Sequence, residues 1–117
     1  MATINYNGRI FRTAANSSGG EVDERTTFRY RQQGNTVWAE YTGGKITFGQ
    51  MIGLVLSDGQ LEIRYQHVNE DGELMTGLGL STPEILTDGR IRLHESWQWT
   101  CGERTRGESV VEEILVL

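Results

Sequence analysis

Glu95 is the residue with the clearest chemical potential, because it stands in a stretch that alternates with the period of a β-strand. Leu93, Trp97 and Trp99 share its side of the chain. If this alternation holds, a carboxylate points inward among aromatic rings. A buried carboxylate needs a partner or a raised pKa. Such a group can hold a polar atom of a ligand, or serve as a general acid or base.

Four further polar residues fall on inward faces by the same count: Tyr30, Gln50, Tyr65 and His67. Together with Glu95, Trp97 and Trp99 they form the predicted ligand-binding set. A barrel of about eight strands is just wide enough to be filled by side chains or to hold one small ligand. Polar groups among aromatic rings therefore fit either a ligand cavity or a satisfied internal hydrogen-bond network, and no catalytic residue can be named from them.

Metal, cofactor and redox chemistry have little support in the sequence. His67 and His94 fall on opposite faces, and no third His or Cys has ligand spacing, so we expect no metal and no cofactor. Cys101 is the single cysteine, so no internal disulfide can form and a reducing cytoplasm is the expected compartment. Arg104 and Arg106 are close to this thiol in the sequence, yet an incidental thiol is the favoured interpretation.

The elements that must position these residues are β-strands joined by tight turns. Three Asp-Gly pairs, at residues 58–59, 71–72 and 88–89, separate alternating runs, and this pairing favours two-residue hairpins. The expected strands are residues 8–13, 26–32, 36–42, 45–57, 60–68, 73–81, 90–100 and a C-terminal segment. We therefore predict an all-β fold: one domain over residues 1–117, an antiparallel meander of about eight strands in a closed or nearly closed, calycin-like barrel.

Three details of this meander are open to test. In residues 45–57, Ile46, Phe48 and Gln50 are predicted to share one face, opposite Gly49 and Gly53. The stretch at residues 81–84, which contains the only proline, is predicted to break its strand. Residues 108–117 fit a helix or a strand, and a strand is favoured because a closed meander needs one to cover its first edge.

Trp38, Leu78 and Leu80 are predicted to lie outside the barrel, as an interface. Exposed tryptophan is enriched in binding hot spots, and Leu78 with Leu80 forms a small apolar edge. These residues motivate the alternative of a homodimer without a ligand.

Composition excludes several classes of partner. The chain has 117 residues and a formal net charge of −5, without a basic face of the kind that nucleic-acid binding needs. No apolar run reaches the length of a membrane span, and the first residues lack a secretion signal. A soluble cytoplasmic protein is expected, with neither nucleic acid nor membrane as a partner.

Five short stretches resemble a family of small bacterial proteins, over nearly the whole chain: NYNGR at residues 5–9, YQHVN at 65–69, GELMTG at 72–77, STPE at 81–84 and HESWQW at 94–99. Members often carry the label "N-acetylglutamate synthase". Such acetyltransferases bind the acetyl-CoA pyrophosphate at a Gly-rich turn that begins a helix. The nearest run, residues 31–36, departs from that pattern and continues as a predicted strand, where no helix N-terminus can hold a phosphate.

The sequence thus ranks four functions. A module that binds a small, partly apolar ligand comes first, and an interaction protein second. An enzyme that uses Glu95 or His67 as acid or base is third, and acetyl transfer is last.

Overall fold

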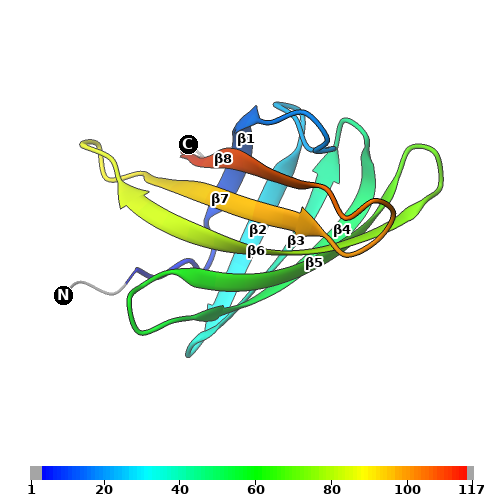
Figure 1. The fold of residues 1–117 in the computed structure, drawn as a ribbon. Helices are drawn as coiled ribbons and strands as arrows, with labels where there is room; N and C mark the ends of the chain where they lie inside the picture. Colours follow the sequence, from blue (N-terminus) through cyan, green and yellow to red (C-terminus); the bar gives the residue numbers. More distant parts are fainter. Residues whose placement is uncertain (1–3, 116–117) are drawn as a thin grey trace.

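The structure, a computed structural model, describes residues 4–115, and in this part the chain forms eight antiparallel strands. They are β1 (Ile10–Asn16), β2 (Thr27–Gln33), β3 (Thr36–Gly43), β4 (Ile46–Val55), β5 (Leu61–Asn69), β6 (Leu74–Ile85), β7 (Ile91–Trp99) and β8 (Arg106–Ile114). Each strand pairs with the next, and β8 pairs with β1, which closes the barrel (Figure 1). The predicted calycin-type meander is confirmed. The N-terminal residues 1–3 and the C-terminal residues 116–117, to which two of the predictions extend, lie outside the described part.

The Asp-Gly turns form as their chemistry requires. Gly59, Gly72 and Gly89 have φ angles of 89°, 77° and 89°, in the left-handed region that favours glycine. In two of these turns the Asp side chain accepts a hydrogen bond from the backbone N–H two residues later, at 3.0 Å from Asp58 to Gln60 and 3.0 Å from Asp88 to Arg90. These turns set the hairpin registers and thereby decide which side chains face inward.

One register prediction is wrong, in β4. Ile46 is buried, but the pairing of β4 with β5 shifts between Ile46 and Phe48, and from there the parity of the strand is reversed. Gly49, Met51 and Gly53 face inward, whereas Gln50 is exposed on the outside. A bulge adds one residue to one strand, and one residue is enough to send every later side chain to the other face.

The predicted strand break at residues 81–84 is also wrong, because β6 continues through Pro83 to Ile85. The pairing of β5 with β6 ends at Leu61 and Ser81, and beyond that point β6 pairs with β7. Pro83 therefore stands on a stretch with the character of an edge, where a missing N–H removes no ladder hydrogen bond.

The C-terminal segment is a strand, and the helical alternative is wrong. Residues 109, 111 and 113 of β8 are buried, and those between them are half-buried. This strand pairs with β1 on one side and β7 on the other. The closing strand satisfies both edges of the meander, which outweighs the local helical spacing of the valines.

The two ends of the barrel differ. At one end Tyr6 is buried against Tyr30, with ring centroids 5.9 Å apart, and the Arg9 Nη1 donates to the Glu113 carboxylate at 2.8 Å. At the other end lies the longest connection, the β1–β2 loop (residues 17–26). This loop shares its end of the barrel with the β3–β4, β5–β6 and β7–β8 turns (Figure 1).

Residues 4–115 contain no helix suited to crossing a membrane.

Candidate functional site

The barrel contains a partly open cavity of about 60 Å³ beside the β1–β2 loop. Five of the seven predicted ligand-binding residues line it, all from β5 and β7: Tyr65, His67, Glu95, Trp97 and Trp99. The inward alternation of β7 that the sequence predicts is observed: residues 91, 93, 97 and 99 are buried, and Glu95 between them is half-buried. The two strands thus bring the aromatic and the polar members of the set together.

Two predicted members lie elsewhere. Gln50 is on the outer face because of the β4 bulge, and Met51 takes the inward position beside it. Tyr30 does face inward but lies in the packed core, where its ring is 4.7 Å from that of Phe11 and its hydroxyl is 3.8 Å from Met51 Sδ. Inward orientation alone did not distinguish a core tyrosine from a cavity tyrosine.

A polar row crosses four neighbouring strands at the level of Glu95. Ser81 on β6 stands opposite Glu95 on β7, Ser109 on β8 follows, and Asn16 on β1 ends the row. The Ser81 hydroxyl donates to Glu95 Oε2 at 2.7 Å, and the Ser109 hydroxyl donates to Oε1 at 3.3 Å. Two neutral hydroxyls are therefore the hydrogen-bond donors that this interior carboxylate has within the described residues.

Burial is the main influence on the ionisation of Glu95. Desolvation raises the pKa of its carboxyl above the usual range, and the hydrogen bonds from Ser81 and Ser109 lower it in part. Burial also raises the pKa of the hydroxyls of Tyr41 and Tyr65, and the negative charge of Glu95 adds to that effect. These phenols keep their protons at neutral pH and act as hydrogen-bond donors.

The β1–β2 loop covers the cavity through direct hydrogen bonds to β5 and β7. Glu21 Oε1 lies 2.7 Å from His67 Nε2, and its Oε2 accepts from Asn69 Nδ2 at 3.0 Å. The Trp99 indole N–H donates to the carbonyl oxygen of Gly19 at 2.9 Å. Side chains from the barrel wall thus hold the loop shut over the end of the barrel.

The same contacts engage both ring nitrogens of His67. The Tyr41 hydroxyl lies 2.9 Å from Nδ1 and 3.4 Å from the carbonyl oxygen of Gln66. His67 Nε2 lies 2.7 Å from Glu21 Oε1, and because a carboxylate oxygen only accepts, Nε2 donates there. His67 is buried and both ring nitrogens are engaged, so in this closed arrangement neither is free to accept a proton from a substrate.

Two cavity aromatics lie over glycines of adjacent strands. Tyr65 stands opposite Gly77, and Trp97 stands opposite Gly107. At either glycine an added Cβ would overlap the aromatic ring. The glycines in β6 and β8 therefore give these rings the space in which they shape the cavity wall.

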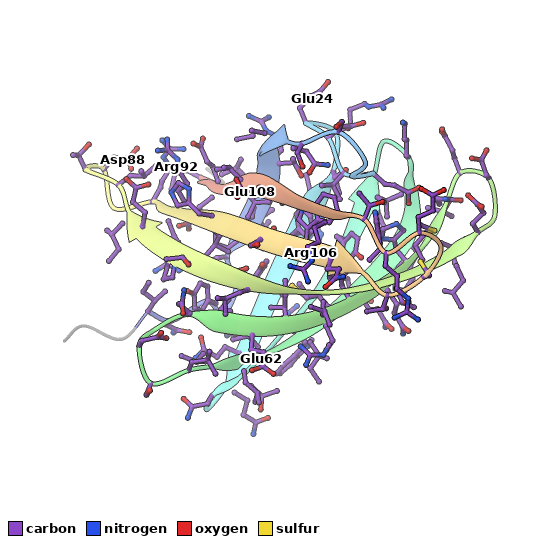
Figure 2. All side chains as sticks on the ribbon, viewed as in Figure 1. Glu24, Glu62, Asp88, Arg92, Arg106 and Glu108 are labelled. Atoms are coloured by element: carbon purple, nitrogen blue, oxygen red, sulfur yellow. The ribbon has the colours of Figure 1, made fainter. Side chains whose placement is uncertain are left out.

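The predicted interface residues lie outside the barrel. Trp38 is 39% exposed on β3, and Leu78 and Leu80 are half-buried on the outer face of β6. Charged side chains also spread over the outside: Figure 2 shows Glu24 on the β1–β2 loop, Glu62 on β5 and Asp88 at the β6–β7 turn, all of them exposed. Glu95 and Glu21 stand apart from this pattern because they line the cavity.

The remaining histidine, His94, and the thiol of Cys101 do not line the cavity. His94 is exposed on the outer face, where its Nε2 lies 2.8 Å from Glu84 Oε1. Cys101 is half-buried in the β7–β8 turn and accepts from the Thr76 N–H at 3.5 Å. Among residues 4–115, no three His, Cys, Asp or Glu side chains gather as a metal site.

Sequence analysis missed Asn16, Glu21, Ser81 and Ser109. The serines could have been found, because Ser81 and Ser109 fall on the inward parity of their strands. Glu21 could not, because a loop has no side-chain period and its path across the barrel is set by contacts distant in the sequence. Asn16 ends β1 beyond the register shift between Thr13 and Ala15, which interrupts the alternation that would have placed it.

The closed eight-stranded meander defines a calycin-type barrel with a lined cavity at one end. A family model described as "Avidin-like protein" matches residues 4–114, so the chain belongs to the avidin-like family. No curated protein matches the chain.

The acetyltransferase turn considered above takes the form of a hairpin. Residues 31–36 comprise the end of β2, the turn at Gly34 and the start of β3. This stretch presents no helix N-terminus to a pyrophosphate.

Proposed function

We propose that this avidin-like barrel binds a small, partly apolar molecule in the cavity beneath the β1–β2 loop. The observation that carries the proposal is the placement of Glu95 and Tyr65 beside Trp97 and Trp99 on the cavity wall. A few polar groups among aromatic side chains are typical of small-molecule sites. Membership of a family known for small-molecule binding, biotin included, supports the same function.

The size of the cavity limits what enters without movement. At about 60 Å³ it has room for a few water-sized groups, far less than a drug-sized site. The β1–β2 loop is the element that can enlarge it, because the part that crosses the cavity is held to β5 and β7 by the hydrogen bonds of Gly19 and Glu21, besides the packing of Val22 on the core. We infer that a larger ligand enters by displacing this loop.

Tryptophan fluorescence tests the proposal with a chain that reports from the cavity alone. In the Trp38→Phe variant the outer tryptophan is gone, and Trp97 with Trp99 gives the signal. We expect at least one compound of a small-molecule library that includes biotin to shift this emission saturably.

The control is Ile63→Phe, which enlarges a cavity-lining side chain without removing a polar group. It should abolish the shift while the barrel stays folded by circular dichroism. A library without any saturable response in the Trp38→Phe chain would contradict the proposal.

Self-association is a second candidate, favoured by a row of side chains on the outer wall. The row runs across five strands in register: Arg31, Trp38, Ile52, Arg64 and Leu78. Trp38 and Ile52 are 39% and 58% exposed. Exposed tryptophan and arginine at the centre of such a patch are typical of interfaces, and a second copy with the same patch is the partner we propose.

Sedimentation velocity checks this second candidate. The wild-type chain is expected to sediment as a dimer at roughly 100 μM, and Ile52→Arg to weaken dimerisation by about tenfold or more, because it places a like charge beside Arg64 at a two-fold contact. The control Leu74→Arg makes the same change at an exposed leucine away from the row. A monomer at every concentration removes this candidate and leaves ligand binding untouched.

A further inference from the structure

We propose that the ligand of this cavity is a small organic cation, an ammonium or guanidinium group on an apolar body, held by Glu95 and the surrounding aromatic rings. This inference rests on the proposed function, since it names the class of ligand that the same cavity takes.

The first step is the hydrogen-bonding character of the polar groups. An ionised carboxylate accepts about four hydrogen bonds, and Glu95 receives two, from Ser81 and Ser109. Asn16 also lines the cavity; its Nδ2 donates to the Val22 carbonyl, and its buried Oδ1 accepts no hydrogen bond from residues 4–115. These two free acceptors call for a ligand that donates.

The second step is charge. Of the charged side chains that line the cavity, Glu21 is held by His67 and Asn69, and Glu95 faces no cation. No Lys or Arg of residues 4–115 lines the cavity, and none of the ion pairs in that part of the chain includes Glu95. An interior carboxylate is stabilised most by an opposite charge that is also hydrogen-bonded to it. The ligand is the natural source of that charge.

The third step is the aromatic wall. The Trp97 and Trp99 ring centroids are 5.6 Å apart, and that of Tyr65 lies 5.8 Å from Trp99. Aromatic faces attract cations, tryptophan most strongly, and more so when the cation is removed from water. The same rings supply apolar contact for the body of the ligand. An anion would gain nothing from them and would meet the repulsion of Glu95.

Two sets of ligands, each with one apolar body and a cationic, neutral or anionic polar group, test this inference on the wild-type chain. Benzylammonium, benzyl alcohol and benzoate share one apolar ring, and n-butylammonium, 1-butanol and butyrate form a smaller set. Dissociation constants from protein-observed NMR at pH 7.5 are expected to be roughly tenfold or more lower for each cation than for its neutral isostere. The butyl set needs less enlargement of the cavity than the benzyl set does.

The Glu95→Gln variant then locates the charge effect. One serine can still donate to the amide oxygen and the other can accept from the amide N–H, so the fold is expected to persist. The preference for cation over alcohol should fall by about tenfold, with the affinity for the alcohol retained. The control Glu108→Gln makes the same change at an exposed residue of β8 and should leave the preference intact.

The outcomes separate this inference from the function on which it rests. Equal or tighter binding of the alcohols or acids by the wild-type chain would overturn the cationic ligand and leave a small-molecule barrel. Binding of library compounds with none of the six probes would overturn it in the same way. Absence of binding by probes and library alike would contradict both. A preference for cations that survives Glu95→Gln would remove Glu95 from the site.

Discussion

The Glu95→Gln variant is expected to be more stable than the wild-type chain at pH 8, by about 1–3 kcal/mol, and the difference should disappear toward pH 4. This range is the cost measured by mutation for burying a polar group without full compensation. The effect arises because burial raises the pKa of Glu95 in the folded state above its value in the unfolded chain. Glutamine fills the same space, offers an acceptor to one serine and a donor to the other, and carries no charge.

The direction of this pH dependence of stability follows from proton linkage. Below the ordinary glutamate pKa, roughly 4.3, residue 95 is protonated in both states and costs nothing. Above it the unfolded chain releases its proton while the folded chain holds on to it, so the folded state binds more protons and stability falls as pH rises. The fall continues until the raised folded pKa has been passed. The wild-type chain loses stability in this way as pH rises, and Glu95→Gln does not.

Urea unfolding between pH 4 and pH 9 measures the difference. Glu108→Gln, which changes the net charge equally at an exposed position, corrects for the general effect of removing one negative charge. A difference between wild type and Glu95→Gln that stayed constant with pH, or grew toward acid, would show that the carboxyl is not desolvated in the apo barrel. The measurement needs no ligand and is independent of the proposed function.

The fold could be predicted from sequence because its signals are local. Asp-Gly turns and two-residue alternation specify hairpins within about twenty residues, and consecutive hairpins leave few arrangements other than a meander. The errors arose where tertiary pairing overrides these signals. The β4 bulge turned Gln50 outward, and the place of Pro83 beyond the end of β5 made a proline compatible with a strand.

The site was predictable only along uninterrupted strands. Five members of the predicted set follow from the alternation of side chains along β5 and β7. Both strands pair with β6 without a register shift. The position of the β1–β2 loop depends on contacts between residues that are distant in the sequence. Glu21 reaches His67 across 46 positions of sequence, and Trp99 reaches Gly19 across 80. Such contacts are set once the barrel has formed, so no short-range pattern encodes them.

Gly107→Val is expected to lower the free energy of unfolding by about 3 kcal/mol, the upper part of the usual range for overpacking. The reason is that Trp97 lies directly over this glycine: a Cβ there would overlap the indole ring, and the register of β7 and β8 holds the two residues opposite each other. The exposed neighbour Glu108, changed to Val, gives the matched control and should alter stability by less than about 0.5 kcal/mol.

A double-mutant cycle with Trp97→Leu decides whether the indole is the cause. In the Trp97→Leu background a smaller side chain faces residue 107, so Gly107→Val should cost about 1–2 kcal/mol less than it does in the wild-type chain. Part of the cost should remain, because the Ser17 hydroxyl also lies close to the position of the added Cβ. Additive costs in the two backgrounds, measured by urea unfolding, would mean that backbone geometry rather than the ring requires glycine. A coupled result would show that one glycine of β8 sets the place of the tryptophan that walls the cavity.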